Sequence, residues 1–454
     1  MNIVILGCGK VGTRITSKLS ESGHNITVID KNRKAVESVT EQFDVIGFVG
    51  DGADADLLQE AQIGKADLMM AMTGDDEVNL ISCLIARNLS KCRTIARMRN
   101  PIYENSLHII GEDLGLAMHV NTERLAADEA ARVIRFPSAM QIDTFNKGRV
   151  ELIKYRIKEG TLLDGMRISD IPSKVRHDVL ICAVERGEDV IIPNGDLVLQ
   201  ARDAISFATT PEREQGIFRI LRGKEKRGRD CMIIGGSVLA YYLSRDLVRS
   251  GIRVTLIERN PEKCDRLSRD LPEVNVINAD AVDHTVLLEE GLEHMDAVVT
   301  LTNSDETNIL LSLYVNRLCS AKIITKMNRL ERDSVIDEMD LDTILVPKDI
   351  TADTVSSYVR AMTNSEGKSS IETLYTLVGG KAEAIEFRIG AGCRLIGVPL
   401  AKLRLKRDLI IACITRYGNI EIPNGRSVIR EGDGVIVVTT RKGLNDIEDI
   451  IDEP

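Results

Sequence analysis

Short apolar runs alternate with helix-like segments along the first hundred residues of the chain. Apolar runs occupy 3–7, 25–30, 44–51, 66–73 and 94–99. Between the first two runs, Val11, Ile15 and Leu19 recur at the spacing of one helix face, and Gly23 ends that segment. Strands that alternate with helices predict an α/β fold, a doubly wound parallel sheet of the Rossmann type.

This pattern occurs twice in the chain. IVILGCGKVG (3–12) corresponds to MIIGGSVLA (232–240), and AMTGDDEVNL (71–80) corresponds to TLTNSDETNI (300–309). Each copy precedes a shorter, β-rich segment, and these two segments share an IPNG turn at 192–195 and 422–425. We therefore predict a duplicated architecture, A-B-A′-B′, in which each Rossmann-like domain is followed by a small α+β module. The predicted domains are 1–136, 147–225, 229–362 and 370–454.

Two further features of the sequence concern the linkers and interfaces between these domains. The predicted linkers lie near 136–147, 222–230 and 364–370, and none is a long Gly/Ser stretch, so we expect neighbouring domains to pack together. Residues 123–135 and their counterpart at 351–360 predict an amphipathic helix that connects A to B and forms an interface.

The amino-acid composition limits which binding partners and which cellular compartment are expected for the protein. The 454 residues carry a formal net charge of -10, with 3% aromatic residues and no Trp, so nucleic acid is not expected as a partner. No apolar run reaches the roughly 18 to 20 residues of a membrane-spanning helix, and the first residues carry no signal-peptide pattern. The nine Cys lack CxxC spacing, which predicts reduced thiols, no zinc site and a cytoplasmic protein.

The first apolar run ends in a glycine fingerprint. Gly7-x-Gly9-x-x-Gly12 opens the first helix, where a tight turn, close approach of a diphosphate and helix packing each require glycine. Asp30 ends the second strand, where a carboxylate accepts ribose hydroxyls and repels a 2′-phosphate. Because strand, helix and acid are all in place, we favour NAD(H) or an adenine nucleotide over the alternative of an ordinary turn. The candidate residues of this turn are Gly7, Cys8, Gly9, Lys10, Val11 and Gly12.

The second fingerprint departs from this pattern. Gly235-x-Ser237-x-x-Ala240 keeps the first glycine, and Glu258 keeps the acid. Ser237 adds a side chain where the phosphate would approach the backbone. We expect this site to bind more weakly, to bind differently or to bind nothing. Its candidate residues are Gly235, Gly236, Ser237, Val238, Leu239 and Glu258.

Polar positions that recur after later strands complete the predicted crevice. They are Asp51 and Asp280 after strand three, Thr73, Gly74, Thr302 and Asn303 after strand four, and Arg97 and Lys326 on strand five. The threonines are candidates for ribose or phosphate contacts, and the two cations for a phosphate or an ion pair. The acidic triplet at 75–77 opens a helix, and we interpret it as capping rather than as a metal site.

Residues for catalysis are not found in matched positions. None of the six His has a counterpart in the other copy, and the B modules contain no pairing at nucleophile spacing. We therefore predict a binding and switching protein with no catalytic or metal site. An NAD-dependent oxidoreductase of unknown substrate is the alternative.

On these motifs, the A units resemble the N-terminal domains of the RCK/KTN family, and the B units resemble RCK C-terminal domains. The tandem order over the whole chain is similar to that of the cytosolic NAD-binding subunits of Trk potassium-uptake systems. The resemblance implies a homo-oligomeric ring, a tetramer, at the inner face of the cell membrane. It implies that NAD(H), or ATP or ADP, changes the ring and so gates a membrane-embedded potassium-translocating subunit. The nucleotide contacts that it implies are residues 7–11, Asp30, Thr73, Gly74 and Arg97, with residues 235–239, Glu258, Thr302 and Asn303 in the second half.

Overall fold

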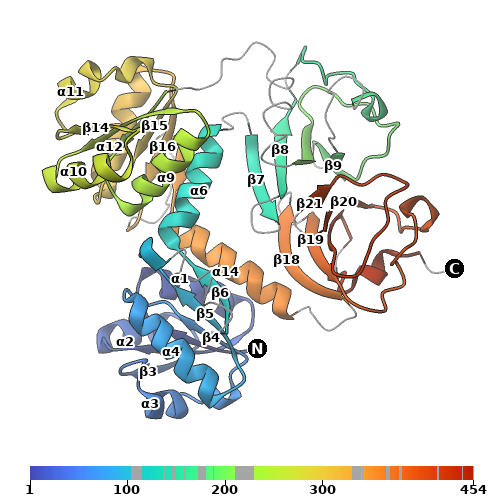
Figure 1. Ribbon diagram of the computed structural model, residues 1–454, viewed down its shortest axis with the longest axis horizontal. Helices are drawn as coiled ribbons and strands as arrows, with labels where there is room; N and C mark the ends of the chain where they lie inside the picture. Colours follow the sequence, from blue (N-terminus) through green and yellow to red (C-terminus); the bar gives the residue numbers. More distant parts are fainter. Residues whose placement is uncertain are drawn as a thin grey trace. The chain divides into compact units, whose positions relative to one another are not determined.

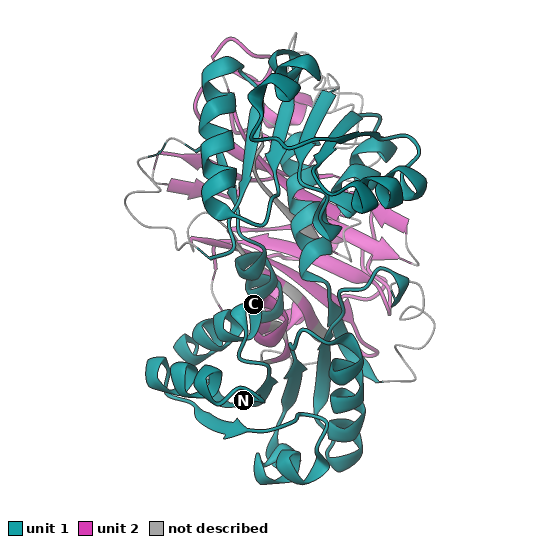
Figure 2. Ribbon diagram, turned by 90° about the vertical axis from the view of Figure 1, so that its left-hand side faces the viewer, with its two compact units in different colours: residues 1–135, 227–356 teal, residues 136–226, 357–454 magenta. Residues whose placement is uncertain are grey.

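The described chain forms two compact units, each made from two separate stretches of sequence (Figures 1 and 2). Unit 1 combines residues 1–135 with 227–356, and unit 2 combines 136–226 with 357–454. The computed structural model describes residues 1–103, 115–135, 139–145, 150–157, 159–171, 180–187, 189–209, 230–329, 339, 341–363, 369–377, 381–416, 419–441 and 443–452. The predicted linkers near 222–230 and 364–370 lie mostly outside these residues, whereas most of the predicted linker near 136–147 forms the strand β7 (Ala139–Phe145). The domain boundaries stay predictions.

The first half of unit 1 is built on a six-stranded sheet. Its strand order is β3-β2-β1-β4-β5-β6, and all five pairings are parallel. The order reverses between β1 and β4, as in dinucleotide-binding folds. The elements are β1 (Asn2–Leu6), α1 (Lys10–Glu21), β2 (Asn25–Asp30), α2 (Arg33–Gln42), β3 (Ile46–Val49), α3 (Ala55–Glu60), η1 (Ile63–Lys65), β4 (Leu68–Ala71), α4 (Asp76–Leu89), β5 (Arg93–Arg97), β6 (Leu116–Val120) and α6 (Thr122–Arg135).

The second half of unit 1 repeats this sheet. Its strand order is β14-β13-β12-β15-β16-β17, again parallel throughout. The duplicated Rossmann-type fold predicted from the sequence is therefore confirmed. The elements are β12 (Asp230–Ile234), α9 (Val238–Arg249), β13 (Arg253–Glu258), α10 (Pro261–Asp270), β14 (Asn275–Asn278), α11 (His284–Glu289), η3 (Leu292–His294), β15 (Ala297–Thr300), α12 (Asp305–Leu318), β16 (Lys322–Lys326), β17 (Thr343–Leu345) and α14 (Pro347–Thr363).

The cores of these sheets follow from the apolar runs. The four residues of β4 and the four of β15 are all buried, as expected for strands with helices on both faces. On α1, Val11, Ile15 and Leu19 are buried, which is the face that the spacing predicts. The sixth strand of each sheet was not predicted. β6 is a half-exposed edge strand and β17 has only three residues, so neither produces an apolar run.

The helices α6 and α14 each contact the opposite half of unit 1. α6 belongs to the first half, but its alanine face joins the buried cluster of the second half, beside Tyr242 and Leu243 of α9. Arg124 of α6 forms an ion pair with Asp246 of α9 at 2.9 Å and lies over the ring of Tyr242. An alanine face lets two helices approach closely. The helix α6, which the sequence predicted as an interface, thus belongs to one half of unit 1 and packs on the other. We call α6 and α14 the exchange helices for this reason.

The reciprocal contact is made by α14 with the charges reversed. Asp349 of α14 binds Arg14 of α1 at 2.7 Å, and Asp353 pairs with Lys18 one turn further along. At these contacts α1 therefore offers bases to two aspartates of α14, whereas α9 offers an acid to an arginine of α6. Ion pairs of this kind contribute modestly to stability, but they penalise wrong partners.

Unit 2 contains two antiparallel five-stranded sheets. Their orders are β10-β9-β11-β8-β7 and β18-β19-β22-β20-β21. Apart from the end of α14, which enters this unit at residue 357, the helical segments among its described residues are short 3-10 turns, η2 (Ile168–Asp170), η5 (Leu400–Lys402) and η6 (Ile447–Ile450). The strands are β7 (Ala139–Phe145), β8 (Val150–Arg156), β9 (Leu180–Arg186), β10 (Asp189–Ile191), β11 (Ala204–Thr209), β18 (Ser369–Leu377), β19 (Ala382–Ile389), β20 (Leu409–Arg416), β21 (Asn419–Glu421) and β22 (Gly434–Thr439).

The recurring charges of the two modules in unit 2 hold turns together. Arg186 donates two hydrogen bonds to Asp203, at 2.9 and 2.7 Å, and Arg416 binds Asp433 with the same two distances. Both aspartates are almost fully buried. One buried cluster contains residues of both sheets, including Cys182 and Cys413. These two Arg–Asp pairs, which occur once in each module, therefore stabilise the fold of the modules.

Candidate functional site

The first glycine turn, between β1 and α1, has no room for a side chain at two of its positions. Gly7 has a φ of +103°, and a Cβ there would lie 2.9 Å from the carbonyl carbon of Met72. A Cβ on Gly12 would lie 1.8 Å from the carbonyl oxygen of Gly7. A Cβ on Gly9 would meet no described atom within 4 Å. Packing therefore requires Gly7 and Gly12, whereas Gly9 leaves the backbone accessible to a ligand.

The helix that follows begins with available N–H groups. Gly9 is its N-cap residue, and no described side chain caps the helix. The first hydrogen bond of the helix runs from the N–H of Thr13 to the carbonyl of Gly9, at 2.8 Å. Within the described chain, the N–H groups of Lys10, Val11 and Gly12 accordingly have no acceptor. Such a helix start favours an anion, and a phosphate above all.

Asp30 ends β2 and faces this turn. Its Oδ2 accepts the N–H of Cys8 at 2.6 Å, and its Oδ1 accepts the N–H of Asn32 at 2.8 Å. Burial, with a smaller effect of Asp30, raises the pKa of the Cys8 thiol to about 12, so the thiol is neutral. The carboxylate thus orders the turn and stands where an acid of this fold accepts ribose hydroxyls.

The second glycine turn keeps the backbone shape but uses more of its own N–H groups. Gly235 has a φ of +107°, and Glu258 accepts the N–H of Gly236 at 2.7 Å. Two hydrogen bonds have no counterpart among the described residues of the first turn. The N–H of Ser237 donates to the carbonyl of Gly235 at 3.1 Å, and the N–H of Ala240 donates to Oγ of Ser237 at 3.3 Å. The serine caps its own helix, so fewer donors remain for a phosphate.

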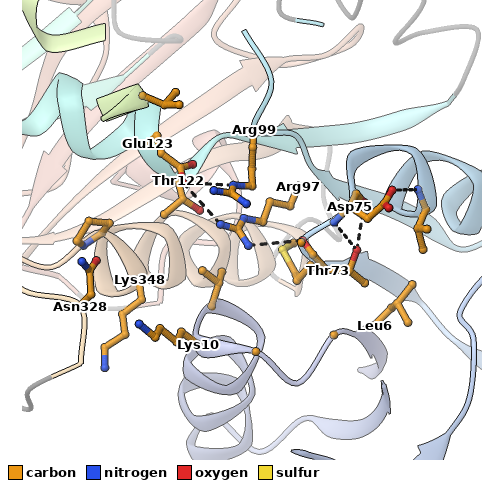
Figure 3. A pocket seen from close by; sticks show the side chains of 18 of the residues that line it. Leu6, Lys10, Thr73, Asp75, Arg97, Arg99, Thr122, Glu123, Asn328 and Lys348 are labelled. Carbon is orange, nitrogen blue, oxygen red and sulfur yellow. Dashed lines mark hydrogen bonds and ion pairs between the residues drawn. The ribbon is translucent and has the colours of Figure 1, made fainter. Parts of the chain in front are cut away.

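A cavity of about 690 Å³ lies against the first turn and is lined by both halves of unit 1. Figure 3 shows Lys10, Thr73 and Arg97 of the first half around it, with Asn328 and Lys348 of the second half. The volume is within the range of about 300 to 1,000 Å³ that ligand sites occupy.

Arg97 is the most buried cation that the first half contributes. Its Nη1 donates to the carbonyl of Thr73 at 3.5 Å, and its Nη2 lies 3.9 Å from Oε1 of Glu123. Arg99 approaches the same carboxylate oxygen at 3.3 Å. Burial lowers the pKa of Arg97, and Glu123 opposes this effect. Nε of Arg97 is buried and has no hydrogen-bond partner among the described residues.

Lys326 occupies the matching position on β16 of the second half. Its side chain is buried, and Nζ donates to the carbonyl of Leu301 at 3.1 Å. Burial lowers the pKa of Lys326, Asp305 and Glu123 raise it, and Lys10 lowers it further. Glu123 and Lys10 both belong to the first half, so charges of the first half affect the pKa of this lysine of the second.

The polar turn after β4 mostly supports the fold. The hydroxyl of Thr73 donates to Oδ1 of Asn79 at 2.7 Å. Asp75 caps α4 by accepting the N–H of Val78. Asp76 accepts backbone N–H groups at the end of β5. These acidic residues thus stabilise the fold. Asp75 caps α4, and Asp76 also holds the backbone that follows β5.

Twelve of the predicted site residues line the cavity, and eight do not. Those that line it are Gly7, Gly9, Lys10, Val11, Asp30, Thr73, Gly74, Arg97, Ser237, Val238, Leu239 and Asn303. Those that do not are Cys8, Gly12, Asp51, Gly235, Gly236, Glu258, Asp280 and Thr302. Asp51 forms an ion pair with Lys31 at 3.0 Å, and Asp280 accepts the N–H of Val282. The ligand roles of all twenty stay predictions.

The sequence prediction missed several residues that line the cavity. Glu123 lies at the start of α6, in a segment predicted only as an interface. Asn328 and Lys348 come from the second half. The sequence prediction treated each Rossmann domain separately. It therefore missed Asn328 and Lys348, which reach the first turn only because the two halves of unit 1 contact each other.

Fold and site define a class of protein, one with duplicated Rossmann domains of which the first has an open glycine turn at the start of its first helix. The model of the TrkA-N domain matches residues 3–116 and 231–347, and the model of the TrkA-C domain matches residues 152–222 and 384–452. The chain belongs to the TrkA family of Trk potassium-uptake proteins.

Relatives match over their full length. The Trk system potassium uptake protein TrkA homolog of Archaeoglobus fulgidus is 32% identical over 99% of this chain and 100% of its own. TrkA homolog 1 of Methanosarcina mazei is 29% identical over 99% of both chains. The solved structure of the GsuK channel bound to NAD has a TM-score of 0.64 and 19% identity, covering 96% of this chain and 76% of that chain. This last likeness shows a shared fold.

Among the described residues, no group of three or more His, Cys, Asp or Glu side chains is placed to hold a metal ion. Similarly, none of the helices described has the length and apolar character to span a membrane.

Proposed function

We propose that this chain is a nucleotide-binding regulatory subunit that gates a membrane potassium-uptake protein. The TrkA relatives, named as Trk-system potassium-uptake proteins, support the system in which it acts. The observation that carries the binding function is the open turn of the first half, where the N–H groups of Lys10, Val11 and Gly12 have no acceptor among the described residues and Asp30 faces the turn. NAD(H) is the first ligand to test, since the GsuK channel of the same fold is bound to NAD, and ATP or ADP are the alternatives.

We propose further that the chain works as a homo-oligomeric ring, a tetramer, held at the inner face of the membrane by the potassium-translocating subunit. In this mechanism the nucleotide acts by differential affinity for two states of the ring, because a ligand shifts an equilibrium only by that difference. No chemical step is required of the ligand. Light scattering of the purified chain tests the subunit number.

The function is tested by titrating the purified chain with NADH, ATP and ADP, using the variants Asp30→Ala and Glu258→Ala as a matched pair. Both carboxylates accept two backbone N–H groups, so both variants lose similar support for their turns. We expect Asp30→Ala to weaken NADH binding about tenfold or more, since a charged hydrogen bond contributes roughly 1.5–3 kcal/mol. Glu258→Ala should stay close to the wild type.

Ion flux through the membrane partner is measured in the same titration. Flux that changes with nucleotide, and that loses this response in Asp30→Ala, supports gating. Steady consumption of NADH with a panel of small ketoacids or imines would instead support the oxidoreductase alternative. A wild-type chain that binds no adenine nucleotide at millimolar concentration would refute the proposal.

A further inference from the structure

We propose that β3, at the edge of the first sheet, is a docking surface for β3 of a second copy of this chain. The two strands pair in antiparallel orientation and join two six-stranded sheets into one. The contact lies apart from the nucleotide site and goes beyond the proposed function. It follows from the exposed side chains of β3, from the backbone groups at its outer side and from the charges of α2.

β3 is an exposed apolar strand. It is the outermost strand of the first sheet (Figure 1), and no described strand pairs with its outer side. Its sequence is IGFV, with Ile46 62% exposed and Val49 39% exposed. Soluble proteins usually protect such an edge with charges, with proline or with a covering element. The corresponding edge of the second sheet, β14, has Asn275 and Asn278 at these two positions. Of the two edges, only β3 is apolar.

The backbone of β3 presents hydrogen-bonding groups at this edge. In a parallel ladder, alternate residues of a strand turn both their N–H and their C=O groups toward the same neighbour. The N–H of Gly50 donates to the carbonyl of Asp30 at 3.0 Å, so every second residue before Gly50 faces β2 in the same way. The N–H and C=O groups of Gly47 and Val49 therefore point away from β2. A further strand beside β3 satisfies these groups.

The sequence around β3 is complementary to itself in one antiparallel register. With a twofold axis at Gly47, Ile46 of one copy lies opposite Phe48 of the other, and Val45 lies opposite Val49. Apolar pairs directly opposite each other are the contacts that stabilise antiparallel strands. The axis itself passes a residue without a side chain. Moving the axis by one residue in either direction breaks both pairs.

The same register keeps like charges apart. The two acids that flank β3 are Asp44 and Asp51, and they lie opposite Gly50 and Phe43 of the other copy. Like charges directly opposite each other would destabilise the pair of strands. The apolar pairs thus form without bringing two carboxylates together, as an interface between identical surfaces requires.

The helix α2 carries its charges in an unusual order. An added Cβ on Gly47 would lie 2.6 Å from a side chain of α2, so this helix packs directly over the middle of β3. Its first turn contains the exposed bases Arg33 and Lys34, and the exposed acids Glu37 and Glu41 follow toward its end. A helix dipole favours the opposite order, with acids first and bases last.

A second copy compensates the charges of α2. Because α2 packs over Gly47, the twofold axis runs between the two copies of the helix and sets them antiparallel. The basic end of each helix then lies beside the acidic end of the other. The corresponding helix of the second half, α10, has the usual order, with Glu262 in its first turn and Arg269 in its last. The apolar edge and the reversed charges occur together in the first half, and both fit the same partner.

Sedimentation velocity of the full chain over a range of concentrations tests the contact. One strand and one helix per copy form a small interface, so we expect reversible association of the wild type. Ile46→Lys should weaken this association about tenfold or more, because lysine on an edge strand opposes pairing. Ile46 is largely exposed, so the variant should stay folded and bind nucleotide like the wild type. The matched control is Asn275→Lys, at the same position of β14, which should associate like the wild type.

Disulfide cross-linking tests the register. Chains with Ile46→Cys should cross-link to chains with Phe48→Cys, because opposite residues have Cβ atoms about 4.5–5.5 Å apart. Neither variant should cross-link by itself, since identical residues of the two copies are diagonal neighbours about 7–8 Å apart. The wild type, oxidised in the same way, controls for the nine native Cys.

Several results would overturn the pairing of β3. One is an equal mass of the wild type and Ile46→Lys at every concentration, and another is an equal loss of association in Asn275→Lys. Cross-links between two Ile46→Cys chains would refute the register with its axis at Gly47. If Ile46→Lys keeps the mass of the wild type but binds the membrane partner more weakly, β3 docks on that partner instead of a second copy. Loss of pairing with intact nucleotide binding leaves the proposed function standing.

Discussion

Replacing Gly12 by Ala tests the first turn most directly, because the second half carries Ala240 at the same position. In the first half an added Cβ would lie 1.8 Å from the carbonyl oxygen of Gly7, and real Cβ atoms essentially never approach closer than 3.0 Å. The backbone must therefore move by about 1.2 Å. Overpacking of this kind costs about 1–3 kcal/mol in stability.

The consequence for binding should be larger than the consequence for stability. Hydrogen bonds to a phosphate need donor–acceptor distances of about 2.7–3.2 Å, so a shift of this size breaks more than one of them. Each charge-assisted bond contributes about 1.5–3 kcal/mol, so the loss of two predicts at least a hundredfold weaker NADH binding in Gly12→Ala. Calorimetry measures the affinity, and circular dichroism checks that the chain remains folded. Ala240→Gly is the matched variant and should leave the affinity unchanged. A folded Gly12→Ala chain that binds NADH within threefold of the wild type would refute this reasoning.

Two further predictions concern the contact between the halves and the buried lysine. Arg124→Asp places like charges beside Asp246 and should destabilise the chain by about 1–2 kcal/mol, and adding Asp246→Arg should recover part of this loss in thermal melts. Strictly additive effects of the two changes would show that the pair is uncoupled. Burial lowers the pKa of Lys326, and a bound phosphate would raise it, so binding takes up a proton and ATP affinity should fall as the pH rises from neutral toward about 10. The decline should be smaller in Lys326→Arg, and a decline of equal size would exclude this lysine as its source.

The sheets were predictable from the sequence because buried parallel strands leave apolar runs and because the duplication repeats each signal. The glycine turn and Asp30 were predictable for a different reason, since each glycine has a distinct steric role that no other residue fills. The edge strands β6 and β17 were missed, because partial exposure and short length leave no such run.

The sequence could not predict that both halves of unit 1 line the same cavity. Lys348 stands at the start of a helix, and nothing in its neighbourhood marks it as a ligand residue. Its place beside Lys10 depends on α14 packing against the other half, which is a tertiary event. In the same way, the sequence did not show that the hydroxyl of Thr73 donates to Asn79 of α4, while its role as a ligand contact stays a prediction.

The opposite charges on the exchange helices have a consequence for the history of the chain. Two identical copies of an ancestral domain would have been free to pair like with like. Here, an α6 set against α1 would bring Arg124 to Arg14, and an α14 set against α9 would bring Asp353 to Asp246. Each of the two helices is therefore matched in charge to the helix that it contacts, and the duplicated halves are no longer equivalent at these two positions.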